Sequence, residues 1–217
     1  MLELAVKSLI AYLLGSLMGA LMIGALRGVD IRTLGSGNAG GTNALRTQGK
    51  LFALGVVVID VAKGWLAARV LPGLDLPGVG IDPAIGRAWL AVACAAGATL
   101  GHVYPVWWEF RGGKGAATIL GVLLGLEPRL LAPVLGTWLL VVMVTGFVGL
   151  GTMIAVATLP AAVHVLAPGQ AALLAFAIAM AVFVVYTHRD NIARMRAGTE
   201  NRARRLWLLR PRAADRG

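Results

Sequence analysis

LAVKSLIAYLLGSLMGALMIGAL, residues 4–26, is an almost unbroken run of apolar residues. A helix rises about 1.5 Å per residue, so about 20 such residues cross the roughly 30 Å hydrocarbon core of a bilayer. The run lacks the small-residue cleavage pattern that follows the short apolar core of a signal peptide. We therefore interpret it as a permanent transmembrane segment, and it decides the fold class.

The rest of the chain repeats this pattern. Of the 217 residues, 58% are hydrophobic and 14% are charged, and the mean hydropathy is +0.79, which is unlike an ordinary soluble domain. Predominantly apolar runs cover residues 4–26, 51–71, 88–108, 115–126, 130–147, 149–166 and 171–186. They predict an all-α polytopic membrane helical bundle of about seven transmembrane segments. The fourth run would rise only about 18 Å, so it predicts a short half-helix.

The charges between the apolar runs predict the orientation. The loop at residues 27–50 is basic, whereas the loop at residues 72–87 carries more acidic residues, and the end of the chain is rich in arginine. By the positive-inside rule, the first loop and the C-terminus are cytoplasmic and the N-terminus lies outside. We expect a single transmembrane domain at residues 1–200 and an arginine-rich cytoplasmic tail at residues 201–217.

Charge distribution and cysteine content argue against a nucleic-acid-binding protein and against a protein with disulfides or a thiolate metal site. The net charge of +10 is compatible with nucleic-acid binding, but the arginines gather beside apolar runs rather than among exposed aromatic residues, so we expect no nucleic-acid partner. The single cysteine, Cys94, lies in an apolar run. The chain therefore forms no internal disulfide and offers no thiolate cluster, and we expect neither a metal nor a cofactor.

The first polar motif, LGSGNAGGTNALR, occupies residues 34–46. Its glycines allow backbone N–H groups to converge on an anion. Further donors are Ser36, Asn38, Thr42 and Asn43. Arg46 can add a bidentate contact to a phosphate. Because the motif matches neither a Walker A loop nor a dinucleotide-binding turn, a flexible cytoplasmic loop is the alternative interpretation.

The second motif, GHVYPVWWEFRGGKGAAT, spans residues 101–118. Its aromatic residues are typical of a membrane interface. Lys114 follows Gly112 and Gly113 at the start of the predicted half-helix, where backbone donors, the helix dipole and a mobile cation all favour phosphate. The alternative is a lysine that only reaches toward the lipid headgroups.

The third motif, HRDNIARMRAGTE, follows the last apolar run at residues 188–200. A basic segment that binds anionic lipid explains its arginines. It does not explain His188 and Asn191 at the end of a span, so we place these two residues near the site. In the second apolar run, Asp60 and Lys63 lie one helical turn apart, and we expect them to pair, either as structural support for the site or as part of its chemistry.

These motifs, in this order, closely resemble the bacterial acyl-phosphate:glycerol-3-phosphate acyltransferase family of the PlsY type. That family shows G-S-G-N-P-G-x-T-N-x-x-R, G-H-x-x-P-x-F-x-x-F-x-G-G-K-G-x-x-T and H-R-x-N-I-x-R-x-x-x-G-x-E segments, and a D-x-x-K-G stretch that is similar to residues 60–64 here. Ala39 stands in the place of the proline, and Trp107 in that of a phenylalanine. The arginine-rich end after Glu200 lies outside the pattern.

The resemblance implies transfer of a fatty acyl group from acyl phosphate to the 1-hydroxyl of sn-glycerol 3-phosphate, giving lysophosphatidic acid and inorganic phosphate in phospholipid biosynthesis. It implies catalytic roles for His102, Lys114, His188 and Asn191. It implies substrate-binding roles for Ser36, Asn38, Thr42, Asn43, Arg46, Gly112, Gly113 and Thr152, the last standing for a serine of the family. The expected location is the bacterial inner membrane, with the site facing the cytoplasm, membrane lipids around the chain, and functional coupling to a soluble enzyme that makes acyl phosphate.

The absence of a recognisable acid–base pair in the sequence is consistent with phosphate as the leaving group. Soluble-site glycerolipid acyltransferases use a His-x-x-x-x-Asp pair, whereas the residues five positions after the three histidines are Trp107, Gly169 and Ala193. An acyl phosphate is a mixed anhydride, so positioning and charge stabilisation can supply most of the rate. The proton acceptor stays open between His102, His188 and the donor phosphate.

Two other functions are compatible with parts of the sequence. A transporter of organic phosphates would also use a basic cavity and a broken helix, but we find no internal repeat between the halves of the chain. A noncatalytic lipid-binding scaffold explains the apolar runs but not the three motifs.

Overall fold

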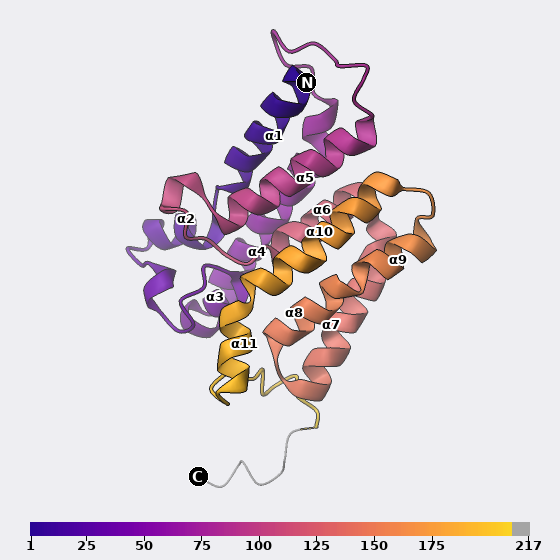
Figure 1. Cartoon of the computed structure of the whole chain (residues 1–217). Helices are drawn as coiled ribbons and strands as arrows, with labels where there is room; N and C mark the ends of the chain where they lie inside the picture. The colour runs from indigo at the N-terminus through magenta and orange to yellow at the C-terminus, as the bar shows by residue number, and fades with distance from the viewer. Residues whose placement is uncertain (210–217) are drawn as a thin grey trace, which may run out of the picture. The chain divides into compact units, whose positions relative to one another are not determined.

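The computed structural model describes residues 1–209, and in this part of the chain every regular element is helical (Figure 1). The α-helices are α1 (Leu2–Gly15), α2 (Gly19–Leu26), α3 (Gly41–Gln48), α4 (Lys50–Trp65), α5 (Arg87–Val103), α6 (Ala116–Leu126), α7 (Leu131–Thr145), α8 (Val148–Ala157), α9 (Leu159–Leu166), α10 (Ala171–Thr187) and α11 (Arg189–Arg196). Short helical turns lie at Ile31–Thr33, Leu66–Val70, Leu71–Gly73, Val106–Trp108 and Pro128–Leu130. The all-α prediction is confirmed. Residues 210–217 of the predicted tail lie outside the described residues.

Each predicted apolar run corresponds to helix. Four helical stretches are long and apolar enough to cross a membrane, and two bent pairs, α1 with α2 and α10 with α11, raise this number to six. The remaining run is α6, which has 11 residues and is short as predicted. The crossing of all seven segments, and the sides on which the termini lie, stay predictions.

The first apolar run is a bent pair of helices, although its sequence reads as one continuous segment. It breaks between α1 and α2, which are bent by 45°. Two buried side chains of α4 bind the backbone at the break: Lys63 Nζ donates to the Leu17 carbonyl at 2.9 Å, and Asp60 Oδ1 accepts from the Gly19 N–H at 3.3 Å. A helix break in lipid requires such partners for its backbone groups. This long-range contact explains why the apolar pattern alone did not reveal the break.

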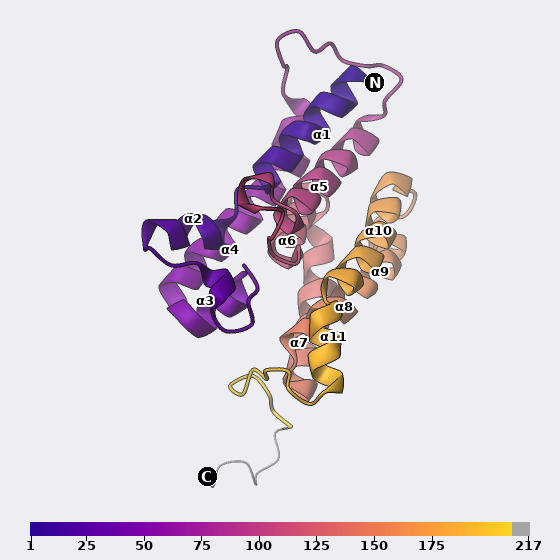
Figure 2. The same ribbon diagram turned by 60° about the vertical axis from the view of Figure 1, so that its left-hand side comes forward.

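The described helices form two compact units, one of residues 1–128 with 170–176 and the other of residues 129–169 with 177–209. In the first unit, α1 and α5 lie side by side (Figure 2). Gly15 faces the backbone of Ala98, and Gly101 faces the backbone of Tyr12, with no room for a Cβ at either glycine. Small residues thus let the two helix backbones approach closely, as is common in membrane bundles.

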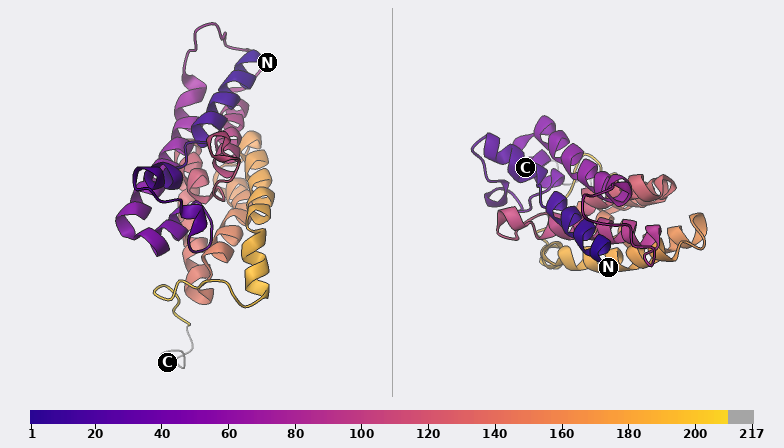
Figure 3. Two further views of the ribbon diagram at one scale, coloured as in Figure 1. Left: turned by 90° about the vertical axis from the view of Figure 1, so that its left-hand side faces the viewer. Right: turned by 90° about the horizontal axis from the view of Figure 1, so that it is seen from above.

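Buried charges hold the loop at residues 74–86 beside the N-terminal end of α1 (Figure 3). Glu3 is only 1% exposed and accepts hydrogen bonds from Lys7 at 2.9 Å and from Arg87 at 2.9 and 2.6 Å. It also accepts from the backbone N–H of Asp82 at 3.0 Å. A buried carboxylate with this many donors is compensated for its lost hydration.

The second unit is built on a hairpin of α7 and α8 (Figure 3). Gly146 ends α7 with a φ of 78°, a conformation that favours glycine. Gly151 packs against the backbone of Trp138 across the hairpin, and Gly149 packs against the side chain of Asn191 on α11. The glycines of α8 therefore allow α7 and α11 to pack closely against it.

Candidate active site

Asn43 organises the first motif. Its side-chain oxygen accepts from the Ser36 N–H at 3.0 Å, and its Nδ2 donates to the carbonyls of Ile31 at 3.2 Å and Leu34 at 2.9 Å. Gly35 has a φ of 57° and lies so close to the Asn43 amide that a Cβ would not fit. The loop is therefore an ordered turn rather than a flexible segment, and Asn43 holds it from inside.

The other polar residues of the motif are more accessible. Ser36 and Asn38 are half-buried in the turn, and Thr42 and Arg46 are exposed on α3. Thr42 and Arg46 are four residues apart, so they share one face of this helix. The motif thus places a hydroxyl and a guanidinium on one exposed face of α3, where both groups can donate to an anion.

Arg32 joins the first motif to the second. Its guanidinium forms a bidentate pair with Asp30, with distances of 2.8 to 3.1 Å, and Nη1 donates to the Trp108 carbonyl at 3.1 Å. The hydrogen bonds from Arg32 hold the pKa of Asp30 below its ordinary value, so this pair stays charged well below neutral pH. Two loops that are more than 70 residues apart in sequence are fastened by this one side chain.

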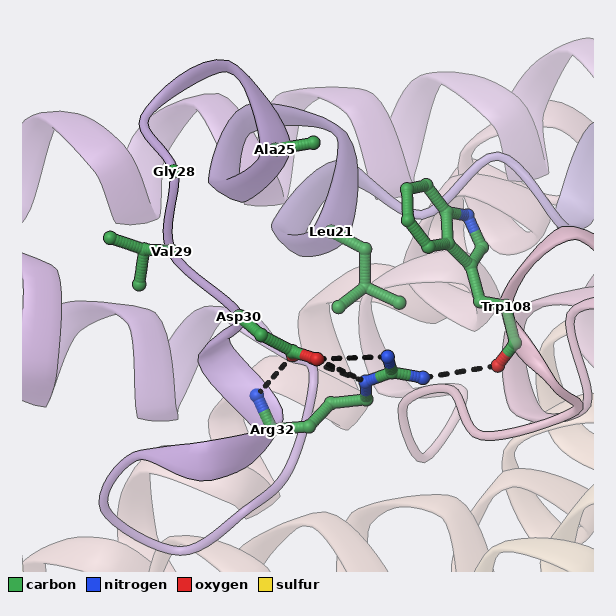
Figure 4. A pocket seen from close by; sticks show the side chains of 7 residues that line it. All are labelled: Leu21, Ala25, Gly28, Val29, Asp30, Arg32 and Trp108. Carbon is green, nitrogen blue, oxygen red and sulfur yellow. Dashed lines mark hydrogen bonds and ion pairs between the residues drawn. The ribbon is translucent and has the colours of Figure 1, made fainter.

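A pocket of about 220 Å³ lies beside this link (Figure 4). It is lined by Leu21, Ala25, Gly28, Val29, Asp30, Arg32 and Trp108. The Arg32 guanidinium spans from Asp30 to the Trp108 carbonyl, and the Leu21 side chain points toward it. The walls are apolar, and the only charged groups belong to an ion pair that is already satisfied.

The second motif folds back on the end of α5. The Gly112 N–H donates to the Val103 carbonyl at 3.1 Å, and the Gly113 N–H donates to the His102 carbonyl at 3.0 Å. Both glycines lie so close to α5 that neither has room for a Cβ. The turn that precedes Lys114 therefore depends on these two glycines.

Lys114 is half-buried and lies directly before α6, as predicted. Gly115 caps α6 with a φ of 90°, so a glycine is needed on this side of the lysine as well. The first amides of α6 have no carbonyl partner within the helix, and the helix dipole places partial positive charge at this end. The positive charge of the Lys114 ammonium and the positive end of the α6 dipole therefore lie at the same end of this helix, which favours an anion there.

His102 lies under the glycine turn. Its ring is 3% exposed, and Gly113 is stacked against it. Its Nδ1 is 3.5 Å from Asp60 Oδ1, and the same oxygen is 2.9 Å from Lys63 Nζ. The predicted pairing of Asp60 with Lys63 is confirmed, and the pair supports both the helix break and the histidine beneath the second motif.

His188 caps α11 at the bend after α10. Its ring is 4% exposed, and Nδ1 lies 2.8 Å from the Val184 carbonyl oxygen. Because a carbonyl oxygen can only accept, Nδ1 carries the hydrogen, and the lone pair of a neutral ring is at Nε2. The backbone of α10 therefore decides the tautomer of His188.

Asn191 and Thr152 belong to the same unit as His188. Asn191 Nδ2 donates to Glu200 Oε1 at 2.8 Å, and Arg194 binds the other oxygen of Glu200 at 2.6 Å. The Asn191 side chain packs on Gly149, and Thr152 follows one turn further along α8, with its hydroxyl donating to the Val148 carbonyl at 3.1 Å. Glu200 therefore orients Asn191.

The predicted site residues are divided between the two compact units. The first unit holds Ser36, Asn38, Thr42, Asn43, Arg46, His102, Gly112, Gly113 and Lys114, and the second holds Thr152, His188 and Asn191. The sequence interpretation missed the linking role of Arg32 and the orienting role of Glu200. Glu200 is an acidic residue within an arginine-rich segment, and this was a sequence signal that it binds a neighbouring side chain. No sequence signal indicates that Arg32 binds the Trp108 carbonyl.

Comparison with known proteins agrees with these motifs. Residues 5–198 match the family model of glycerol-3-phosphate acyltransferase. A glycerol-3-phosphate acyltransferase of Sinorhizobium fredii is 41% identical over 192 residues, which cover 88% of either chain. Another, of Synechococcus elongatus, is 40% identical over 206 residues, which cover 93% of this chain and 95% of the relative.

Two solved structures share the fold. Both are crystal structures of PlsY (YgiH), an integral membrane glycerol 3-phosphate acyltransferase. The glycerol 3-phosphate form has a TM-score of 0.79 and 33% identity, covering 92% of this chain and 94% of that one. The lysophosphatidic acid form has a TM-score of 0.78 and 31% identity, covering 94% and 97%.

Fold, motifs and relatives together define an integral membrane acyltransferase. The chain belongs to the glycerol-3-phosphate acyltransferase family of the PlsY type. The resemblance seen in the sequence is confirmed, and neither a transporter nor a noncatalytic scaffold is supported.

Proposed function

We propose that this protein transfers a fatty acyl group from acyl phosphate to the 1-hydroxyl of sn-glycerol 3-phosphate, giving lysophosphatidic acid and inorganic phosphate. The family supports acyl transfer to glycerol 3-phosphate, and the two solved relatives are described in forms with that substrate and that product. The observation that carries the proposal is Lys114 at the N-terminus of α6, in the same compact unit as the ordered loop of Ser36 and Arg46.

The reaction needs electrostatic help more than covalent help. The hydroxyl oxygen of glycerol 3-phosphate attacks the acyl carbonyl carbon, the bond from that carbon to the phosphate oxygen breaks, and the phosphate leaves. The hydroxyl proton goes to a phosphate oxygen of the donor, or to His188, whose neutral ring has its lone pair at Nε2. We favour the donor phosphate, because it becomes more basic as the bond to carbon breaks. His102 is a poor acceptor because it is buried under Gly113.

Two anionic phosphates must approach each other, so the site requires several cationic and amide donors. We assign the leaving phosphate to Lys114 and the first amides of α6. The phosphate of glycerol 3-phosphate then binds Arg46 and Thr42 on α3, with Ser36 and Asn38 as further donors. Asn43, Gly112 and Gly113 shape the two loops, since their atoms are engaged in holding the backbone.

His188 and Asn191 are proposed to take part in the same reaction, on the match of residues 188–200 to the family pattern. The structure supports this proposal by fixing the tautomer of His188 and by orienting the Asn191 amide through Glu200. Thr152 is a weaker candidate because its hydroxyl already donates to its own helix.

Asp60 and Lys63 are proposed to support the site without entering the chemistry. Asp60→Asn should lower both thermal stability and activity, because loss of one partner of a buried ion pair costs roughly 3–5 kcal/mol. Adding Lys63→Gln should restore much of both, since the new amide at position 60 can still accept from Gly19 and the new amide at position 63 can still donate to Leu17. Melting temperature and kcat are the measurements. Recovered stability without recovered kcat would show that the charges act directly in the reaction.

We propose that the protein lies in the bacterial inner membrane with about seven transmembrane segments, of which α6 is a short half-helix, and with the site facing the cytoplasm. Cysteines at Lys50 and Ala197 in a Cys94→Ala background should be labelled only by reagents that reach the cytoplasm, and one at Asp75 only from outside. The neighbouring Gly49, Gly78 and Gly198 are avoided because their φ values of 87°, 75° and 71° do not suit a cysteine. Labelling of positions 50 and 197 from opposite sides would refute the seven-span topology.

The acyl phosphate is proposed to come from a soluble enzyme that makes it and to which this protein is functionally coupled. The function is tested by incubating purified protein with palmitoyl phosphate and following inorganic phosphate. Phosphate release is expected only when glycerol 3-phosphate is present, with one lysophosphatidic acid formed for each phosphate. Phosphate release without acceptor, at the same rate, would indicate a hydrolase instead.

A further inference from the structure

Residues 201–209, which we call the C-terminal strap, fasten themselves to the end of α7. The Ala203 N–H donates to the Gly146 carbonyl at 2.7 Å, and the Leu208 N–H donates to the Met143 carbonyl at 2.9 Å. The indole of Trp207 donates to the Val144 carbonyl at 3.0 Å. The last carbonyls of a helix lack partners within it, and the strap supplies them here.

One exposed arginine of the strap packs against the protein. The Arg202 guanidinium lies 4.2 Å from the ring centres of both Phe147 and Trp207, and its Nη1 donates to the Thr145 carbonyl at 2.9 Å. A cation between two aromatic rings at the C-terminal end of a helix is stabilised by both the rings and the helix dipole. Arg202 therefore stabilises the contact between the strap and α7, and its guanidinium is already engaged by two rings and a carbonyl of the protein.

The rest of the strap faces outward with a mixed composition. Arg204 and Arg205 are exposed, and they are followed by Leu206, Leu208 and Leu209, which are 41%, 66% and 67% exposed. Three exposed leucines within four residues would be unfavourable in water. Their position is at the end of the span Pro128–Thr145, to which the strap is bonded. The end of a transmembrane helix generally lies where hydrocarbon gives way to headgroups.

We propose that the strap is an interfacial anchor that binds anionic phospholipids. Leu206, Leu208 and Leu209 enter the boundary between acyl chains and headgroups, while Arg204 and Arg205 bind the phosphate groups of the same leaflet. Arginine beside apolar residues at the end of a span matches a negatively charged lipid surface. The family model ends at residue 198, so this surface lies outside the acyltransferase pattern. The proposal does not depend on the acyl donor.

Spin-labelled lipids test the proposal on the full-length protein. A fluorophore is placed at Asn201→Cys in a Cys94→Ala background, because Asn201 is exposed and belongs to neither the leucines nor the arginine pair. The protein is reconstituted into phosphatidylcholine vesicles that contain a small fraction of headgroup-nitroxide phosphatidylglycerol or phosphatidylcholine. Each interfacial arginine is worth about fivefold in local lipid concentration, so quenching should favour the phosphatidylglycerol probe at least about fivefold.

The variant Arg204→Gln with Arg205→Gln should bring this ratio close to one, while quenching by the phosphatidylcholine probe stays at the parent level because the strap remains docked. The matched control is Arg27→Gln with Lys50→Gln, which removes the same charge from exposed positions on the other compact unit. The control should keep the ratio of the parent.

Three results would overturn the anchor. Equal quenching by the two probes in the parent would show no preference for anionic lipid. An equal loss of preference in the control variant would show a diffuse charge effect. Quenching that is relieved by lysophosphatidic acid, but not by unlabelled phosphatidylglycerol, would assign the arginines to the product and not to bilayer phospholipid.

Discussion

Lys114→Ala is expected to abolish acyl transfer while the protein still inserts and purifies normally. The lysine is half-buried and stands between two glycines at the start of α6, so its removal leaves no large cavity and breaks no helix. In the proposed mechanism, its ammonium meets phosphate charge that increases as the acyl bond to phosphate breaks. Loss of one such donor costs roughly a hundredfold to a thousandfold in kcat.

The measurement is kcat with palmitoyl phosphate and glycerol 3-phosphate, together with the melting temperature of each variant. Lys114→Arg should also be poor, because a planar guanidinium does not replace a compact ammonium in a glycine-bounded turn. Lys50→Ala is the control, since Lys50 is exposed at the start of α4 and lies outside the three motifs. An activity of Lys114→Ala within about threefold of the parent would contradict the assignment.

The second large effect concerns the donor. Purified protein is expected to use acyl phosphate and to show no measurable transfer from acyl-CoA or acyl-carrier protein. A thioester needs a positioned base or a covalent relay, and the chain has no His-x-x-x-x-Asp pair. Phosphate, in contrast, is a small leaving group, and the lysine and amide donors of the proposed site would bind it both in the substrate and after it leaves.

Mass spectrometry of the lysophosphatidic acid formed from each donor makes the comparison direct. Inorganic phosphate should inhibit the reaction with acyl phosphate, because it occupies the site of the leaving group. Comparable rates with acyl-CoA, in the absence of any acyl phosphate, would require the proposed mechanism to be withdrawn. Such a result would not affect the proposal that the strap binds lipid, because the quenching experiment does not depend on acyl transfer.

The conformation of the two motif loops was readable from local sequence because it depends on local contacts. Glycines on both sides of Lys114 are needed for the turn before α6, and the structure keeps them in close contact with α5 or in a left-handed conformation. The same holds for the loop around Asn43, where a single side chain satisfies three backbone groups. Motifs of this kind contain most of their own contacts.

Roles that depend on distant partners were not readable. The sequence shows Arg32 only as one basic residue of the loop at residues 27–50, yet Arg32 joins Asp30 to the Trp108 carbonyl. The sequence predicts a catalytic role for His102, which stays a prediction, but it does not reveal that the ring is buried beneath Gly113 and beside Asp60. A polar group in an apolar run predicts that some partner exists, but not which one.

The sequence by itself determined that this is an all-helical membrane protein, that one apolar segment is too short for a full span, and that three polar motifs carry the acyltransferase family. Hydrophobic length and glycine content are properties of short stretches, so no knowledge of packing was needed. Only the tertiary structure decided where the first span breaks, because the partners of the broken backbone, Asp60 and Lys63, lie on another helix. It alone decided that Glu200 orients Asn191 and that Arg202 fastens the strap, since these contacts depend on how chain segments fold back onto one another.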